Sequence, residues 1–257
     1  MALLEIDRLS VVYGRRPPTV SGVTLRLERG RIVGLVGESG SGKSTLARAL
    51  VGLARIAEGT VALDGEAVAY LGGAELRALR GRVQMVFQDP YLSLNARLTV
   101  AETLAHALRA HSRKPKGAHA AAIRDLLDDV RLHPRLADRY PHQLSGGQRQ
   151  RVALARALAA EPDVIVADEI TSALDVSVQA GILRLLDRLR RERDLACLFI
   201  SHDLAVVRAL SDTVAVMYRG EIVEQGPTAE LFARPGHPYT RALLDAVPRR
   251  GEAPSGG

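Results

Sequence analysis

The chain has 257 residues, 47% of them hydrophobic, which is typical of a globular protein with a real core. This length suits one large α/β domain with a small lobe, or two small domains. No apolar run approaches the roughly 20 residues that a bilayer-spanning helix needs, and residues 1–10 lack the basic-then-apolar order of a signal peptide. These features predict a protein in the cytosol or on the cytosolic face of a membrane.

The net charge of +6 raises the question of nucleic-acid binding. The arginines are scattered without interleaved aromatic residues, and lysine occurs only at Lys43, Lys114 and Lys116. This pattern favours a compositional preference for arginine, with some attraction to anionic membrane surfaces, and no nucleic-acid partner is expected. Cys197 is the only cysteine, so the chain cannot build a disulfide or a zinc site within itself, and its apolar neighbours predict burial.

The first half of the chain begins with β patterns broken by glycine turns. Strands are predicted at residues 3–12, 23–27, 32–36, 60–63 and 83–87, and a helix at 45–53. From residue 90 to 141 the β signals vanish, which indicates a helical lobe. Its helices are predicted near 100–111 and 118–130, on either side of a basic loop with proline and glycine at 112–117.

The second half alternates strands and helices. A helix is predicted at 148–160, followed by strands at 164–167 and 198–200, helices at 178–191 and 204–210, a hairpin at 214–224, and short helices at 227–233 and 239–247. This alternation predicts a mostly parallel sheet covered on both faces. The tail at 249–257 is rich in glycine, proline and serine and is predicted to be disordered.

A glycine-rich loop follows the strand predicted at 32–36 and opens the helix after it. Its sequence, Gly37-Glu38-Ser39-Gly40-Ser41-Gly42-Lys43-Ser44, fits the phosphate-loop pattern in the strand–helix context that the pattern requires. Backbone N–H groups would face phosphates there, with Lys43 reaching the β- and γ-phosphates and Ser44 ligating Mg²⁺. The residues expected to bind the nucleotide are Gly37, Ser39, Gly40, Gly42, Lys43, Ser44 and Thr45. A glycine-rich connection that binds nothing is the alternative.

The strand predicted at 164–167 ends in two consecutive acids, Asp168 and Glu169. Acids at the end of a buried strand need a partner or a metal ion. Asp168 suits a Mg²⁺ carboxylate, acting directly or through water, and Glu169 suits the general base that polarises an attacking water. Many strands end in acids, so this pair alone is a weak signal. It indicates a catalytic site because a phosphate loop precedes it in the same alternation of strands and helices.

The string Leu144-Ser145-Gly146-Gly147-Gln148 predicts a second helix start that binds phosphate. Ser145 is a good N-cap, and Gln148 stands at the capping-box position. Gly146 and Gly147 leave the backbone N–H groups uncovered, and a helix N-terminus of this kind binds anions. The string has no lysine and no Mg²⁺ ligand, so it can only add to a phosphate held elsewhere. An ordinary capped helix is the alternative.

Together these motifs resemble the ABC-type ATPases, whose signature motif the string at 144–148 matches, and the resemblance covers almost the whole chain. It implies an α/β P-loop NTPase core with a mostly parallel sheet, an N-terminal antiparallel β subdomain and a helical lobe at about 90–160. Residues 1–248 would form a single nucleotide-binding domain. ATP and Mg²⁺ are the implied cofactors, and the implied activity is ATP hydrolysis coupled to transmembrane transport.

The resemblance assigns roles to residues that carry little signal alone. Gln88 resembles the glutamine that contacts Mg²⁺ or the attacking water, and His202 the switch histidine at the γ-phosphate. Tyr13 resembles the aromatic residue that stacks on adenine, and Asp175 belongs to a loop that crosses to the partner subunit. A structural histidine and an exposed strand tyrosine are the alternatives for His202 and Tyr13.

Ile170 departs from the family, which normally has proline directly after the two acids. Proline would fix φ and remove an N–H donor. Isoleucine is therefore expected to leave this loop freer, without touching the residues that carry the chemistry.

One phosphate loop and one signature per chain imply a pair of chains. In the family two such domains pair head to tail, and ATP on one loop is capped by residues 145–148 of the other chain. The partner is a second copy (a homodimer) or a sister ATPase subunit (a heterodimer). Two membrane permease subunits and, indirectly, an extracytoplasmic substrate-binding protein would complete an importer, with this chain peripheral at the cytoplasmic face of the cell membrane.

Three further strings refine the resemblance. Residues 236–244 look like the tail motif of the oligopeptide, dipeptide and nickel importer ATPases, and residues 88–95 and 171–180 match the same subgroup. The expected cargo is therefore peptides, or else nickel or a metallophore. A soluble ABC ATPase that acts on nucleic acid or ribosomes is the alternative function, although such proteins usually carry tandem domains or long coiled coils.

Overall fold

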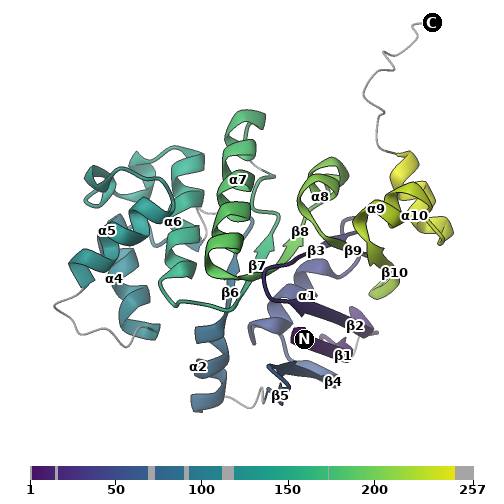
Figure 1. Ribbon diagram of the computed structural model, residues 1–257. Helices are drawn as coiled ribbons and strands as arrows, with labels where there is room; N and C mark the ends of the chain where they lie inside the picture. Colours follow the sequence, from purple (N-terminus) through teal and green to yellow (C-terminus); the bar gives the residue numbers. More distant parts are fainter. Residues whose placement is uncertain are drawn as a thin grey trace, which may run out of the picture.

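The computed structural model describes residues 2–14, 17–68, 73–89, 93–111, 119–172 and 174–246. Its elements are arranged as Figure 1 shows. The strands are β1 (Ala2–Val11), β2 (Val20–Glu28), β3 (Ile32–Val36), β4 (Ile56–Leu63), β5 (Glu66–Ala67), β6 (Val83–Val86), β7 (Val164–Asp168), β8 (Ala196–Ile200), β9 (Thr213–Tyr218) and β10 (Glu221–Pro227). The helices are α1 (Lys43–Leu50), α2 (Gly73–Arg82), α4 (Val100–His111), α5 (His119–Asp129), α6 (Gly146–Leu158), α7 (Val176–Arg193), α8 (Leu204–Leu210), α9 (Thr228–Ala233) and α10 (Pro238–Asp245).

A six-stranded sheet in the order β10-β9-β3-β8-β7-β6 forms the centre of the protein. From β9 to β6 all neighbouring strands are parallel, and β10 returns beside β9 as an antiparallel hairpin. Both faces are covered: Ile165 and Ala167 of β7 lie in the core shared with the helices, whereas Val164 and Val166 lie in a second core. This confirms the predicted, mostly parallel sheet.

A smaller antiparallel sheet in the order β2-β1-β4-β5 packs over α1 and the second core. In β1, Leu4 and Ile6 are buried while Asp7 and Arg8 are exposed. Leu46 and Leu50 of α1 lie in the same core as these β1 residues, so this helix lies between the two sheets. The expected N-terminal antiparallel β subdomain is therefore present.

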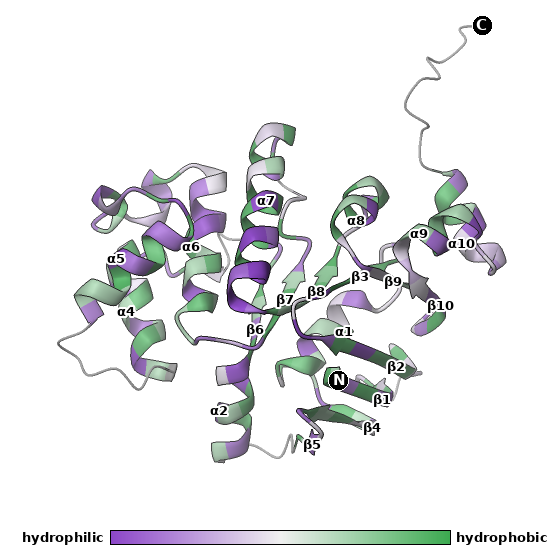
Figure 2. Ribbon diagram, in the orientation of Figure 1, coloured by the Kyte–Doolittle hydropathy of each residue, from purple (hydrophilic) through white to green (hydrophobic). Residues whose placement is uncertain are grey.

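The helices α4, α5 and α6 pack against one another beyond α7, at the left of Figure 1. Val100, Leu104 and Leu108 of α4 recur every four residues and are all buried, as an amphipathic helix requires. The same logic holds for α7, whose inner side is apolar and whose outer side is hydrophilic in Figure 2. No helix within the described ranges is both long and apolar enough to cross a membrane.

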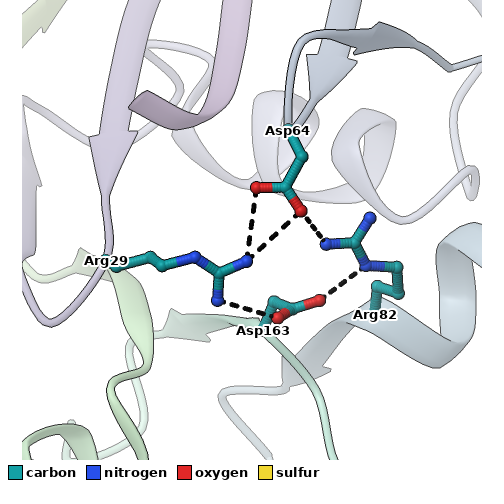
Figure 3. Close-up of polar contacts among 4 residues, drawn as sticks. All are labelled: Arg29, Asp64, Arg82 and Asp163. Atoms are coloured by element: carbon teal, nitrogen blue, oxygen red, sulfur yellow. Dashed lines mark hydrogen bonds and ion pairs between the residues drawn. The ribbon is translucent and has the colours of Figure 1, made fainter. Parts of the chain in front are cut away.

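Four charged side chains join the two sheets at their shared corner (Figure 3). Arg29, after β2, donates to Asp64 at 3.2 Å and to Asp163 at 3.0 Å, and Arg82 at the end of α2 donates to the same two carboxylates. Asp64 follows β4, and Asp163 precedes β7. Single pairs at the surface contribute little, but this closed ring of alternating charges fixes the position of the small sheet relative to the central one.

The main departure from the predicted elements is α2, a helix that no sequence pattern indicated. Only Leu79 of this helix is buried, so it has no apolar stripe that a periodicity argument could detect. Cys197 is 1% exposed, as expected. The loop predicted at 112–117 and the tail predicted at 249–257 lie outside the described residues.

Candidate active site

The glycine-rich loop of residues 37–44 joins β3 to α1 and is tightly packed on one side. A Cβ atom on Gly37 would stand 2.1 Å from the carbonyl oxygen of Met217, and one on Gly42 would stand 2.7 Å from that of Thr19. Both glycines also have positive φ, at 152° and 110°. A Cβ on Gly40 would meet nothing within 4 Å, so the loop is open at this point.

Lys43 closes the loop from inside. Its Nζ donates to the carbonyl oxygens of Gly37 at 2.8 Å and Glu38 at 2.7 Å, and the residue is only 5% exposed. Burial lowers the pKa of Lys43, against the opposing effect of the Glu169 and Asp168 carboxylates. The ammonium group thus sits within reach of anything that the loop binds.

Ser44 and Asp168 form a hydroxyl–carboxylate pair at the C-terminal end of β7. Ser44 Oγ donates to Asp168 Oδ1 at 3.2 Å. Asp168 is 5% exposed, and burial, reinforced by the neighbouring Glu169, raises its pKa. A hard, hydrated cation such as Mg²⁺ takes one or two protein oxygens plus substrate phosphates, and this pair fits that need. Within the described ranges no group of three or more His, Cys, Asp or Glu residues could hold a metal by itself.

Glu169 lies at the meeting point of three segments that are far apart in the sequence. Gln88 Nε2 donates to Glu169 Oε2 at 3.0 Å, and His202 Nδ1 lies 3.6 Å from the same oxygen. The backbone of Glu169 has φ of 48°, and its N–H donates to the carbonyl of Ile200 on β8. A positive φ is sparsely populated for a residue other than glycine, and the Glu169 side chain is 20% exposed.

The helix start at residues 145–148 has the predicted cap. Ser145 Oγ accepts from the Gln148 N–H at 3.3 Å, and Gln148 Oε1 accepts from the Ser145 N–H at 2.9 Å. Gly146 and Gly147 also have a packing role that the sequence did not reveal. A Cβ on Gly147 would stand 2.4 Å from Val178 Cγ1 of α7, and one on Gly146 would stand 3.3 Å from Leu174. The close approach of α6 to the start of α7 therefore requires glycine at position 147.

The remaining predicted residues lie at the edges of this region. Asp175 caps α7 by accepting from the Val178 N–H at 3.0 Å, and this bond lowers the pKa of Asp175. Tyr13 is 44% exposed just after β1. Ile170, which stands where the family normally has proline, is 2% exposed and packs in the core under the helices. The packing of the Ile170 side chain thus anchors this segment, whereas a proline would stiffen its backbone.

Sequence reasoning missed two contacts that the C-terminal part of the chain makes with the loop. The Gly220 N–H donates to the carbonyl oxygen of Ser41 at 2.9 Å, and the Glu38 N–H donates to the phenol oxygen of Tyr239 at 3.0 Å. Both pairs join residues at least 179 positions apart (220 − 41 = 179), so no local pattern could have revealed them.

Comparison with known proteins identifies the family. The family model described as ABC transporter matches residues 20–172, more than half of the chain. The chain belongs to the ABC transporter family. A second model, described as the C-terminal region of oligopeptide/dipeptide transporters, matches residues 223–255 of this ABC ATPase.

Curated relatives agree with both matches. The oligopeptide transport ATP-binding protein OppF of Escherichia coli (strain K12) is 50% identical over 259 residues, which cover 96% of this chain and 78% of that protein. OppF of Streptococcus mutans is 44% identical over 251 residues, covering 96% of this chain and 82% of that protein. The glutathione import ATP-binding protein GsiA of Pectobacterium atrosepticum is 50% identical over 234 residues, covering 91% of this chain but 38% of that protein.

Solved structures confirm the fold. The cbiO1 protein of Clostridium perfringens, part of the ABC transporter complex cbiONQ, aligns with a TM-score of 0.82 at 28% identity and covers 91% of each chain. A dimeric post-hydrolysis state of the ATP-binding cassette MJ0796, bound to ADP and Pi, aligns at 0.78 with 31% identity, covering 88% of this chain and 98% of that one. The predicted ABC ATPase is confirmed, and these relatives give no support to a soluble enzyme acting on nucleic acid or ribosomes. ATP-binding subunits of ABC importers work with membrane permease components.

The opposite pKa shifts of Asp168 and Asp175 predict opposite pH dependences of stability. Asp168 has a raised pKa, so its ionised form destabilises the fold above that pKa, and the penalty disappears as the pH falls to the ordinary carboxyl range near about 4. Without nucleotide or Mg²⁺, Asp168→Asn should therefore have a higher Tm than the wild type at pH 7.5, and the gap should shrink toward pH 4.

Asp175→Asn is the matched control. Because the pKa of Asp175 is lowered, its ionised form stabilises the fold above the ordinary carboxyl range, and this contribution is lost as the pH falls. The variant should have a lower Tm than the wild type at pH 7.5 and converge with it in acid. Thermal unfolding of the wild type and the two variants between pH 4 and 8 measures both differences in Tm. A Tm for Asp168→Asn below that of the wild type at pH 7.5 would contradict the argument that burial destabilises the ionised Asp168.

Proposed function

We propose that this ABC ATPase binds ATP with Mg²⁺ through the phosphate loop and hydrolyses it to power an importer of peptides. The observation that carries the proposal is the convergence of Gln88, Glu169 and His202 beside the Ser44–Asp168 pair. A nucleophile-activating carboxylate next to a cation site is the arrangement that phosphoryl transfer to water needs.

Nucleotide binding is assigned to the open side of the loop. The N–H groups near Gly40 and the start of α1 face an incoming phosphate chain, and Lys43 exchanges its carbonyl partners for the stronger, charge-assisted bonds that β- and γ-phosphate oxygens offer. Thr45 adds a phosphate contact, and Tyr13 stacks on adenine from its exposed position. Ser44, Asp168 and Gln88 would hold Mg²⁺, which would supply positive charge against the phosphates.

Glu169 is assigned as the general base of hydrolysis. Its carboxylate accepts a proton from the water that attacks the γ-phosphorus, while the amide of Gln88 orients that water. His202, at the end of β8, lies where it contacts the γ-phosphate oxygens and donates to them. The Gln88–Glu169 hydrogen bond gives the base a fixed direction before the substrate arrives.

The signature at residues 145–148 is assigned to the site of a second chain. Its glycines pack against α7, and its capping hydrogen bonds join Ser145 and Gln148 to each other. The phosphate loop instead contacts β7, β9 and α10. The two anion sites of one chain therefore face different parts of the fold. A head-to-tail pair, formed with a sister ATPase or a second copy, brings each signature over the other chain's nucleotide, with Asp175 at the crossing.

Permease subunits are assigned to a groove between the central sheet and the helical lobe. The groove has a volume of about 620 Å³ and is lined by Leu53, Met85 and Phe87 on one side and by Leu98 and His106 on the other. Leu53 is 54% exposed, so it is accessible to a partner. An amphipathic helix fits such a groove, one residue away from Gln88.

The relatives support a peptide cargo. The OppF relatives are oligopeptide transport proteins by name, and the match at residues 223–255 points the same way, so peptides are the proposed cargo. Nickel or a metallophore is the cargo that the sequence also leaves open. The permease and an extracytoplasmic binding protein select the cargo, and this chain sits peripherally at the cytoplasmic face of the membrane.

Glu169→Gln tests the hydrolysis step. The variant keeps the size of the side chain but cannot accept a proton, so kcat for ATP should fall by about 10²- to 10⁴-fold while ATP binding persists. Phosphate release and nucleotide titration measure the two effects. Glu161→Gln, on a turn after α6, is the control and should leave kcat unchanged. Normal turnover in Glu169→Gln would remove this residue from the mechanism.

Ser145→Arg tests the pairing of chains. The added bulk should leave ATP binding to a single chain within about twofold and reduce hydrolysis by about 10²-fold or more, because a transition-state contact from the partner is lost. Ala120→Arg, an exposed position on α5 in the same lobe, is the control for added charge. Loss of binding in the isolated Ser145→Arg chain would show that the signature serves its own site.

Leu53→Cys tests the permease groove. Cys197 is buried and burial raises its pKa to about 12, so a thiol reagent reacts with the introduced cysteine alone. In membranes that hold the assembled transporter, a bifunctional reagent at position 53 should cross-link to a permease subunit. Thr24→Cys, exposed on β2, should not. Equal cross-linking from both positions, or none from position 53, would contradict this docking site.

A further inference from the structure

A tyrosine of the C-terminal segment touches the phosphate loop. The Glu38 N–H donates to the phenol oxygen of Tyr239 at 3.0 Å, across 201 residues of sequence. Glu38, Ser39 and Gly40 are the exposed rim of the loop. The loop is therefore braced at its exposed end by a side chain from α10.

The position of Tyr239 is itself well fixed. The Glu224 carboxylate of β10 accepts from the Gly236 N–H at 2.7 Å and from the His237 N–H at 2.9 Å, which ties the start of α10 to the hairpin. The ring of Tyr239 packs on that of Tyr218, with centroids 4.2 Å apart. Burial, together with the nearby Glu38 carboxylate, raises the pKa of Tyr239, so its hydroxyl stays neutral.

The same C-terminal unit holds the other end of the rim. The Gly220 N–H, in the turn between β9 and β10, donates to the Ser41 carbonyl at 2.9 Å. Tyr239 and Gly220 thus contact residues on either side of Ser39 and Gly40. Both groups belong to the segment from β9 to α10, so this part of the chain contacts the rim on both sides.

We propose that Tyr239 is a positioning residue of the nucleotide site: its phenol oxygen fixes the Glu38 amide, and the segment from β9 to α10 thereby sets the affinity of the phosphate loop. This inference rests on the proposed nucleotide site. Tyr239 acts through the loop backbone and is not assigned a contact with the reacting atoms. Any change that shifts α10 relative to β10 is transmitted to the loop through this single hydrogen bond.

The physical reason is preorganisation. A loop that is already in its binding conformation does not lose backbone freedom when the phosphates arrive. A neutral hydrogen bond of this kind contributes about 0.5–1.5 kcal/mol, which corresponds to about a 2- to 10-fold change in affinity. The ring stacking is unaffected by removal of the hydroxyl.

Tyr239→Phe is the decisive variant, because it deletes one oxygen and keeps the ring. Titration calorimetry of the full chain with MgADP measures loop affinity without hydrolysis. We expect a Kd raised about 2- to 10-fold and faster hydrogen exchange at the Glu38 amide, with a Tm close to that of the wild type. Tyr218→Phe removes a hydroxyl from the stacked neighbour and should leave Kd and exchange unchanged. An unchanged Kd in Tyr239→Phe, or equal losses in both variants, would overturn the proposal.

A double-mutant cycle with Glu224→Ala tests the coupling to β10. If Glu224 acts through Tyr239, the two losses should not add. The variant that carries both Glu224→Ala and Tyr239→Phe should then have a Kd for MgADP no higher than the higher of the two single-variant values. Additive losses would show that Glu224 acts by another route and would overturn the coupling. Lys43→Ala tests the proposed nucleotide site independently of Tyr239. If this variant binds MgADP as tightly as the wild type, the proposed nucleotide site is wrong, regardless of the result for Tyr239→Phe.

Discussion

The close packing of the phosphate-loop backbone against the end of β9 is the constraint on which the rest of the site depends. Gly37 approaches the Met217 carbonyl so closely that a Cβ atom would stand 2.1 Å from it, and a Cβ atom on Gly42 would stand 2.7 Å from the Thr19 carbonyl oxygen. Since Lys43 and Ser44 follow directly, their directions are set by this contact. The loop is therefore shaped by the sheet beneath it, and only its rim at residues 38–40 is exposed.

Around that loop the fold brings together charges that would not gather in a structure built only for stability. Asp168 is buried beside Glu169, and its raised pKa records the electrostatic cost. Gln88 and His202 approach the same Glu169 oxygen from the ends of two other strands. Parallel strands end at a common edge, so three separate segments converge without any long loop. The charge ring of Arg29, Asp64, Arg82 and Asp163 at the corner of the sheets is, by contrast, balanced and structural.

Much of the fold could be predicted from local patterns. The parallel strands of the central sheet are short, mostly apolar runs. The bounds of α4 and α8 were predicted correctly, because their apolar residues recur at helical spacing. The capping box of Ser145 and Gln148 was also predicted, since it needs only residues three apart. The helix α2 was missed because a single buried residue gives no period. The burial of Ile170 in the core under the helices was not predicted, because it depends on contacts with residues far away in the sequence.

The sequence by itself determined the kind of chemistry: a glycine-rich loop with Lys43 and Ser44, a strand ending in two acids, and a capped helix start, each defined within a few residues. The tertiary structure alone decided which of these groups meet. It packs Gly147 against Val178, turns Glu169 toward Gln88 and His202, and sets Tyr239 against the Glu38 amide. The reason is the sequence distance over which each interaction acts. Caps and loop conformations are set by neighbours along the chain, whereas close approach between helices, strands and side chains depends on how the sheets and helices pack.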